Sequence, residues 1–367
     1  MKADLTIRSH LRDYGVRFVE DLAVPLRELA DGNAFFVIDA LVWRIYAPAF
    51  QAVVGSDRLL TVEAAETNKT LDKVREIIET LVDRRVRRGD RLVAVGGGII
   101  QDVTAFAASI IYRGIEWSFL PTTLLAQADS CIGSKTSINL GDRKNLVGNF
   151  YPPSDIYIDT GFLESLSVDD IKSGIGEILH YYIYANDDAL DDLLRDYATL
   201  IRDRRLLSTH IRRSLEIKRS VIEADEFDRG ERNKFNYGHT FGHALESVTG
   251  YAVKHGQAVT VGMDLANYMS ATLGLMSDER FRDLHRRLSV NFPEYDLATI
   301  DLEAYFMALS KDKKNVGDNV GCILAQDVGI LLKRQLPMDD SFRETIRRYF
   351  HEFSPGKDRD VRHAGIR

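Results

Sequence analysis

Few cysteines, no basic surplus and no long apolar run set the first limits on what this 367-residue chain does. Cys131 and Cys322 are too few for a disulfide framework or a cysteine-based zinc site, so a reducing cytoplasm fits. A net charge of −7 argues against nucleic acid as the main partner. The longest apolar run, near residues 103–112, is too short to span a membrane, and the charged residues 2–12 leave no apolar core for a signal peptide. We therefore expect a soluble protein that binds neither nucleic acid nor membrane.

The order of the predicted elements indicates two domains. The chain is too long for one ordinary core, and 45% apolar with 28% charged residues is a globular composition. Buried-strand patterns alternate with helices up to about residue 163, and helical patterns dominate from about residue 168. We predict an α/β domain over residues 1–163 and a helical domain over residues 164–367. Strands are expected at residues 34–38, 58–62, 91–95, 115–120, 156–158 and 320–324, and helices at residues 70–87, 103–112 and 209–223.

Three glycines between a predicted strand and a predicted helix point to an anion site. Gly96, Gly97 and Gly98 follow the strand that ends at residue 95. Bare backbone amides and the partial positive charge of a helix N-terminus together favour a pyrophosphate. The spacing is not GxGxxG, so a plain tight turn stays the alternative. Asp39, at the end of an earlier strand, is either a ribose acceptor or a helix cap.

Three histidines indicate a metal site in the second half. His239 and His243 are four residues apart, so both project from one face of a helix, and a turn after that helix can return His255 to the same place. Ordinary helix histidines are the alternative. Thr240 stands where a zinc protease of the HExxH type needs its glutamate, which excludes that class. Glu177 lies in an otherwise apolar helix, and a buried carboxylate needs a partner such as a cation.

A polar stretch at residues 129–139, followed by Lys144 and Asn145, is too rich in small hydrogen-bonding residues for a core element. Charged groups on such an ordered loop suit a small polyhydroxy or phosphate ligand.

These residues stand in spaced motifs that resemble the sugar phosphate cyclases, most closely the 3-dehydroquinate synthase family. The resemblance runs from about Asp39 to Gly317. Its motifs are Gly-Gly-Gly-x-x-x-Asp at 96–102, Tyr-Arg-Gly at 112–114, Pro-Thr-Thr-Leu-Leu-Ala at 121–126, Asp-Ser at 129–130, Lys-Thr at 135–136, Lys-Asn at 144–145, Gly-Glu at 176–177, Asp-Glu at 225–226, Asn-Tyr-Gly-His-Thr at 236–240, Gly-His-Ala at 242–244 and His-Gly at 255–256.

The resemblance implies a Rossmann-like α/β N-terminal domain that binds NAD, an all-α C-terminal domain that binds a metal, and a substrate in the cleft between them. The cofactors would be NAD and Zn²⁺ or Co²⁺, and the assembly a homodimer. The implied metal ligands are Glu177, His239 and His255, so His243 becomes a substrate-side residue instead of a ligand.

The resemblance also assigns residues to the two small molecules. The NAD-side positions are Asp39, Glu66, Lys69, Gly97, Gly98, Asp102, Thr122, Thr123, Asp129, Lys144 and Phe162. The positions around the phosphate, hydroxyls and carboxylate of the substrate, which include the catalytic ones, are Arg113, Asp129, Lys135, Asn145, His180, Lys218, Arg232, Asn236, His243 and Lys314.

The implied reaction converts 3-deoxy-arabino-heptulosonate 7-phosphate to 3-dehydroquinate. A ring alcohol is oxidised transiently by NAD, phosphate leaves by β-elimination, the hydride returns, and an intramolecular aldol step closes the carbocycle. Basic side chains such as Lys135, Lys218 and Arg232 would hold the phosphorylated acid in one conformation.

Departures from the family pattern leave the substrate open. His180 replaces the usual lysine three residues after the metal-binding glutamate, and imidazole is shorter and often neutral. Arg232 and Asn236 are retained, which favours a substrate with a carboxylate. One alternative is a cyclase of specialised metabolism that acts on an amino-heptulosonate 7-phosphate, sedoheptulose 7-phosphate or glucose 6-phosphate. Others are a metal-dependent alcohol dehydrogenase of related fold and a homologue that binds without catalysis.

Overall fold

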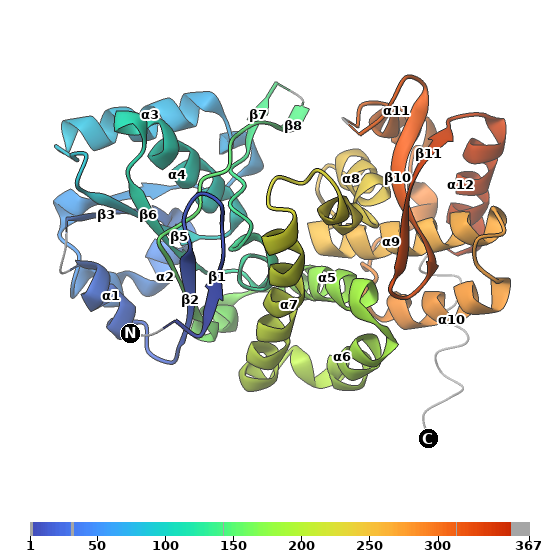
Figure 1. Ribbon diagram of the computed structural model, residues 1–367, viewed down its shortest axis with the longest axis horizontal. Helices are drawn as coiled ribbons and strands as arrows, with labels where there is room; N and C mark the ends of the chain where they lie inside the picture. Colours follow the sequence, from blue (N-terminus) through green and yellow to red (C-terminus); the bar gives the residue numbers. More distant parts are fainter. Residues whose placement is uncertain (1–2, 31–32, 142, 313, 354–367) are drawn as a thin grey trace. The chain divides into compact units, whose positions relative to one another are not determined.

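The computed structural model describes residues 3–30, 33–141, 143–312 and 314–353 (Figure 1). The chain divides into two units: unit 1 comprises Met1–Leu166 and Asp203–Asp228, and unit 2 comprises Ser167–Arg202 and Arg229–Arg367. The predicted domains, 1–163 and 164–367, differ from these units in two respects: unit 1 extends to Leu166, and it also includes Asp203–Asp228. The helix α7 (Arg204–Ala224) belongs to unit 1 because it packs against the short helices η4 (Ala126–Ser130) and η5 (Thr160–Ser165) of that unit.

A seven-stranded sheet forms the centre of unit 1, with the strand order β1-β2-β9-β6-β5-β3-β4. The edge strand β1 runs antiparallel to β2, and the other six strands are parallel to their neighbours. Parallel strands are covered on both faces, which explains the continuous apolar run of β3. The strands are β1 (Leu5–Ile7), β2 (Tyr14–Val19), β3 (Ala34–Asp39), β4 (Leu59–Val62), β5 (Arg91–Gly96), β6 (Glu116–Pro121) and β9 (Asp155–Asp159).

The chain reverses its direction across the sheet between β3 and β5. It leaves β3 for β4 through α2, and then passes through α3 and α4 to β5 and β6 on the other side of β3. Right-handed crossovers place α2 on one face and α3 and α4 on the opposite face. The carboxyl ends of β3 and β5 therefore form the switch point at which open α/β sheets bind ligands. The helices are α1 (Ala23–Ala30), α2 (Ala40–Gln51), α3 (Leu71–Asp83) and α4 (Gly98–Ile110), with the short helices η1 (Ser56–Arg58), η2 (Glu66–Asn68) and η3 (Ile111–Arg113).

The five strands predicted between residues 34 and 158 are confirmed within one residue at each end. The three helices predicted at 70–87, 103–112 and 209–223 are confirmed with shifted ends, as α3, α4 and α7. Thr70 is the N-cap of α3, and its side chain accepts from the Lys73 amide. The polar stretch expected to be a loop instead contains part of η4, a π-helix, and the hairpin of β7 (Ile138–Leu140) and β8 (Arg143–Val147). These strands are short and mostly exposed, so they carry no apolar alternation.

Unit 2 is helical, as predicted, and also carries one hairpin among its described residues. The helix α9 (His255–Thr272) lies at its centre, buried along most of its length and packed against α5, α8, α10, α12 and β10. None of the described helices of the chain is long and apolar enough to cross a membrane. The other elements are α5 (Val168–Ala185), α6 (Asp187–Leu200), η6 (Glu231–Asn236), α8 (His239–Val248), α10 (Asp278–Leu288), η7 (Ser289–Asn291), η8 (Leu297–Thr299), α11 (Leu302–Ser310), β10 (Asn319–Asp327), β11 (Ile330–Pro337) and α12 (Asp340–Glu352).

Glycines let α5 and α8 approach the backbone of α9. A Cβ atom on Gly176 of α5 would overlap the carbonyl of Gly256 in α9, and a Cβ on Gly256 would overlap the carbonyl of Ser173. A Cβ on Gly242 of α8 would lie 2.9 Å from the Ala258 carbonyl oxygen. Since no side chains separate the three helices at these points, the residues that flank the glycines come together.

Candidate active site

The turn between β5 and α4 has features that suit an anion. No side chain caps the first turn of α4, so its leading amides stay available to a ligand. The amide of Thr122, just after β6, donates to the Gly96 carbonyl at 2.9 Å. A Cβ on Gly97 would lie 3.0 Å from Thr123 Cγ2, whereas a Cβ on Gly98 would meet only Ser130 Oγ, at 3.7 Å. The fold itself therefore restricts residue 97, whereas it leaves space for a side chain at residue 98.

Asp39 is the N-cap of α2. Its Oδ1 accepts a hydrogen bond from the Leu41 amide at 2.9 Å, which confirms the capping alternative. Burial raises the pKa of Asp39, and the Leu41 amide and Arg44 oppose that change. A role toward ribose stays a prediction, and the position of Asp39 at the switch point is consistent with it.

Hydrogen bonds and ion pairs connect several predicted NAD-side residues of unit 1, among which Lys69 is buried. Lys69 Nζ lies 2.6 Å from Asp102 Oδ2 and donates to Asn145 Oδ1 at 2.6 Å. Lys144 Nζ lies 4.0 Å from Glu66 Oε1. Burial raises the pKa of Asp102 to about 6 in spite of the Lys69 ammonium. Asn145, predicted to contact the substrate, thus shares a network with residues predicted to contact NAD.

Two further pairs in unit 1 hold predicted substrate lysines. Lys218 of α7 donates from Nζ to Asp129 Oδ1 at 2.8 Å and to the Asp129 carbonyl oxygen at 2.7 Å. Lys135 Nζ lies 2.5 Å from Asp228 Oδ2. Both lysines are therefore oriented by carboxylates before any ligand binds, and a bound anion would compete with or add to these contacts.

Two predicted residues of unit 1 lie apart from these networks. Phe162 is buried in the core under α2, where its ring meets the edge of Tyr46 at 5.0 Å. Arg113 is exposed at the end of η3 with φ 67°, next to Tyr112 with φ 51°. Such backbone conformations are uncommon for residues other than glycine, and they are often found at functional positions.

In unit 2 the predicted metal ligands converge. Glu177 Oε1, from α5, lies 3.1 Å from His255 Nε2 and 3.8 Å from His239 Nε2. The Glu177 side chain is only 2% exposed, and its Oε1 accepts no hydrogen bond with acceptable geometry from the described residues. A buried carboxylate oxygen without a donor, faced by two imidazole nitrogens, suits a divalent cation.

The other nitrogen of each imidazole has its own partner. His239 Nδ1 lies 3.1 Å from the Tyr237 carbonyl oxygen, and His255 Nδ1 lies 2.9 Å from Glu246 Oε2. An Nδ1–H donor in each ring leaves the Nε2 lone pair for a metal, which is the usual outer arrangement of histidine ligands. Burial lowers the pKa of His239 to about 4 although Glu177 opposes this, so the ring is neutral at pH 7. Burial also lowers the pKa of His255, but Glu246 and Glu177 outweigh it and raise the pKa well above its usual value. A metal would displace that proton.

His243 and His180 lie beside the ligand group. The ring of His243 stacks on His255 at 5.5 Å, and one ligand nitrogen from each of His239, His243 and His255 lies within 4.8 Å of the others. The three-histidine pattern read from the sequence is therefore present in space. His180 is fully buried, with its ring 5.3 Å from that of His239.

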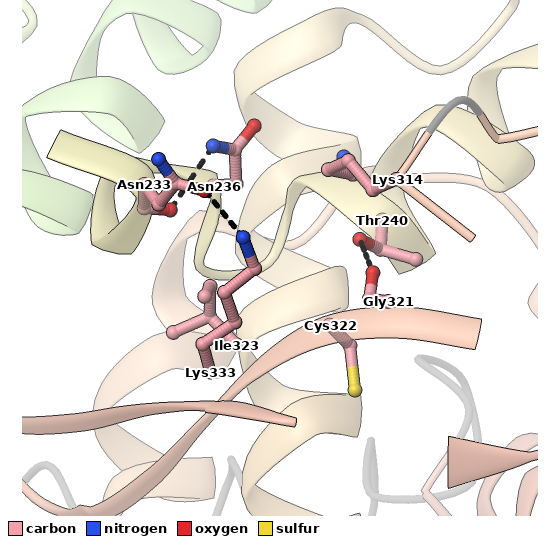
Figure 2. Close-up of a pocket in the computed structure, with 8 residues that line it drawn as sticks. All are labelled: Asn233, Asn236, Thr240, Lys314, Gly321, Cys322, Ile323 and Lys333. Atoms are coloured by element: carbon pink, nitrogen blue, oxygen red, sulfur yellow. Dashed lines mark hydrogen bonds between the residues drawn. The ribbon is translucent and has the colours of Figure 1, made fainter. Parts of the chain in front are cut away.

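A small pocket of unit 2 contains two of the predicted substrate residues, Asn236 and Lys314 (Figure 2). Asn236 Nδ2 donates to the Asn233 carbonyl oxygen at 3.0 Å, and Lys333 Nζ, from β11, donates to Asn233 Oδ1 at 2.7 Å. Arg232, which directly precedes Asn233 in η6, is buried. The remaining residues that line the pocket are Thr240, Gly321, Cys322 and Ile323.

Sequence reasoning missed three residues that support these groups. Glu246 Oε2 and the Tyr237 carbonyl oxygen lie within hydrogen-bond distance of the imidazole Nδ1 atoms, and Lys333 reaches the pocket from the hairpin. A glutamate near the end of an amphipathic helix and a lysine on an exposed strand are ordinary features. The only signal for Glu246 was its place between His243 and His255 in the same motif.

Comparison with known proteins identifies the family. Residues 59–173 match the family model described as 3-dehydroquinate synthase N-terminal, and residues 174–315 match the 3-dehydroquinate synthase C-terminal model. The chain belongs to the 3-dehydroquinate synthase family. The family matches therefore cover the glycine turn, the Lys69 network partners and all the metal-side residues.

Relatives within the 3-dehydroquinate synthase family cover most of the chain. The 3-dehydroquinate synthase of Campylobacter concisus (strain 13826) is 32% identical over 95% of this chain and 100% of its own length. That of Cereibacter sphaeroides (strain ATCC 17025 / ATH 2.4.3) is 36% identical over 79% of this chain and 82% of its own length. Among solved structures, a 2-deoxy-scyllo-inosose synthase complexed with carbaglucose-6-phosphate, NAD⁺ and Co²⁺ superimposes with a TM-score of 0.83, at 26% identity, over 95% of this chain and 99% of that one.

Proposed function

We propose that this chain is a 3-dehydroquinate synthase, a carbon–oxygen lyase that converts 3-deoxy-arabino-heptulosonate 7-phosphate to 3-dehydroquinate and phosphate. The relatives that cover most of the chain carry this name. The observation that carries the proposal is the convergence of Glu177, His239 and His255 on one buried point in unit 2.

The donor set suits a Zn²⁺ or Co²⁺ cofactor. One carboxylate oxygen and two imidazoles leave a position open for substrate oxygens, as catalytic sites of these metals require. Glu177, His239 and His255 would hold the ion, which would act as a Lewis acid on a substrate hydroxyl. The buried and unsatisfied Glu177 Oε1 is the feature that fits this assignment.

In unit 1 the switch point suits NAD. NAD would supply reversible hydride transfer at the ring alcohol of the substrate, without net reduction over a turnover. The amides of Gly97 and Gly98 and the N-terminus of α4 would bind its pyrophosphate, and Asp39 its ribose. The Lys69–Asp102 pair would fix the loop that carries Glu66, Lys144 and Asn145.

The other predicted residues would bind and orient a substrate with two anionic groups, a phosphate and a carboxylate. Each unit carries cations suited to anionic groups: Lys135 and Lys218 in unit 1, and Arg232 and Lys314 in unit 2. Asp129 orients the Lys218 ammonium through two contacts. Arg232 is suited to a carboxylate because its guanidinium presents two parallel donors.

Phosphate release from a panel of sugar phosphates tests the proposal. The purified protein, loaded with NAD⁺ and Zn²⁺ or Co²⁺, should release phosphate from 3-deoxy-arabino-heptulosonate 7-phosphate and form 3-dehydroquinate, with no accumulation of NADH at 340 nm. No turnover with this substrate, while another sugar phosphate reacts, would overturn the assignment. Light scattering on the same preparation tests the expected homodimer.

A cyclase that acts on another sugar phosphate is the second candidate, and His180 favours it. The buried imidazole beside His239 stands where the family usually has a lysine. If His180→Lys changes the preferred sugar phosphate, residue 180 sets specificity. If the substitution leaves the preference unchanged, this reason for the second candidate disappears.

The same assay separates the other two alternatives. An alcohol dehydrogenase would form NADH in proportion to product. A homologue that binds without catalysis would bind NAD⁺ and Zn²⁺ but release no phosphate from any substrate in the panel.

A further inference from the structure

The imidazole of His255 lies between two buried carboxylates. Its Nε2 is 3.1 Å from Glu177 Oε1, and its Nδ1 is 2.9 Å from Glu246 Oε2. The side chains of Glu177 and Glu246 are 2% and 8% exposed. The first carboxylate belongs to the proposed metal site, and the second comes from α8 and has no role in the function described so far.

Only one arrangement of protons lets His255 bind a metal through Nε2. The Nδ1–H must then be the donor, and Glu246 Oε2 is its acceptor. His239 is oriented in the same way, but its acceptor is the neutral carbonyl of Tyr237 at 3.1 Å. A carboxylate attracts the Nδ1 proton more strongly than a carbonyl does, so it gives Nε2 of His255 more electron density.

We propose that Glu246 is a positioning residue of the metal site. It holds His255 in the Nδ1–H tautomer with Nε2 directed toward Glu177, and it raises the affinity of the site for a divalent cation. This inference rests on the metal site of the proposed function.

Unit 2 contains a second carboxylate–histidine pair that serves as a matched control. Asp264 Oδ2 lies 2.7 Å from His285 Nδ1, and Asp264 is fully buried. Asp264 lies nine residues after His255 on α9, which is about 13 Å along the helix. Removal of the Asp264 carboxylate tests the loss of a buried carboxylate–histidine contact without a change at the metal ligands.

The experiment measures the affinity of the full-length protein for Zn²⁺ by competition with a chelator, and the visible absorption of the Co²⁺ form. For Glu246→Gln we expect Zn²⁺ affinity to fall about 10- to 100-fold and the Co²⁺ bands to shift, with activity regained at saturating metal. For Asp264→Asn we expect a lower melting temperature but wild-type Zn²⁺ affinity. Equal Zn²⁺ affinity in Glu246→Gln and wild type would overturn the proposal.

A second measurement covers the case in which Glu246→Gln does not fold. The ¹⁵N spectrum of histidine-labelled wild-type protein with Zn²⁺ should show His255 protonated at Nδ1 and bound to metal through Nε2, and the opposite tautomer would overturn the proposal. If the wild type binds no divalent metal, the metal site of the proposed function itself fails. If the wild type binds metal and releases phosphate while Glu246→Gln matches it in affinity, only the role of Glu246 fails.

Discussion

The two units build their sites in different ways. In unit 1 several candidate cofactor residues, such as Asp39, Gly97 and Thr122, stand at the ends of parallel strands or just after them, where backbone amides and buried or half-buried polar side chains lie. In unit 2 the candidate ligands project from within α5 and from the starts of α8 and α9, which touch through glycines. The arrangement in unit 1 suits a large ligand that is recognised mainly through its phosphates. The arrangement in unit 2 suits a small ion that needs several donors at one buried point.

We expect the largest effect from a change in the buried metal site of unit 2. Glu177→Gln replaces the carboxylate oxygen that faces both imidazoles with a weaker, neutral donor. We expect Zn²⁺ affinity to fall by at least about 100-fold, more than is usual for outer partners of ligands. NAD⁺ affinity should change less than about 2-fold, because the cofactor residues belong to unit 1. Competition with a chelator measures the Zn²⁺ affinity, and titration calorimetry measures the NAD⁺ affinity. A Zn²⁺ affinity like that of the wild type would show that Glu177 is not a ligand.

The same difference explains what the sequence could and could not predict. A strand, three glycines and a helix are local features, so the turn at Gly96 and five of the strands were predicted from the sequence alone. The β7–β8 hairpin was not, because its strands are short and mostly exposed. The place of α7 in unit 1 depends on its packing against η4 and η5, which no local pattern encodes.

The metal ligands of unit 2 could not all be predicted from the spacing of residues in the sequence. Spacing alone brought the three histidines together, and the structure shows that they are neighbours. The apolar helix around Glu177 indicated a cation partner for its carboxylate, but its grouping with His239 and His255 came only from the family resemblance. The sequence gives no sign of that grouping because α5 meets α9 at Gly176 and Gly256, far apart in the chain. Glu246 was missed because nothing in a single helix indicates which distant imidazole its carboxylate will meet.

We expect a smaller effect, on NAD⁺ affinity, from a change in the glycine turn of unit 1. Gly98→Ala adds a methyl group that the fold accommodates, with Ser130 Oγ 3.7 Å from the new Cβ. Alanine is favoured over glycine in a helix by about 1 kcal/mol, so the variant should be as stable as the wild type or more so. The methyl group would stand over the amides that bind pyrophosphate, and we expect NAD⁺ affinity to fall about 10-fold, or about 1.4 kcal/mol. Zn²⁺ affinity should stay the same.

Gly97→Ala is the matched variant for that experiment. Its Cβ would lie 3.0 Å from Thr123 Cγ2, so it should lower the melting temperature as well as NAD⁺ affinity. If Gly98→Ala binds NAD⁺ as tightly as the wild type, the turn at residues 96–98 is a structural turn and not a phosphate site.

We expect the smallest effect, on KM, from a change in the β10–β11 hairpin of unit 2, which tests whether this hairpin takes part in substrate binding. Lys333 on β11 reaches Asn233, whose carbonyl oxygen accepts from Asn236, so the loss of its ammonium should loosen the η6 turn and remove one positive charge from the pocket. For Lys333→Gln we expect KM for the sugar phosphate to rise about 2- to 5-fold at unchanged kcat, since an exposed contact of this kind contributes at most about 1 kcal/mol. Arg334→Gln removes the same charge from the next residue, which points to the opposite face of the strand, and should leave KM unchanged. Equal changes in both variants would mean that KM responds to net charge and not to the Lys333–Asn233 contact, and the hairpin would then only support the core of unit 2.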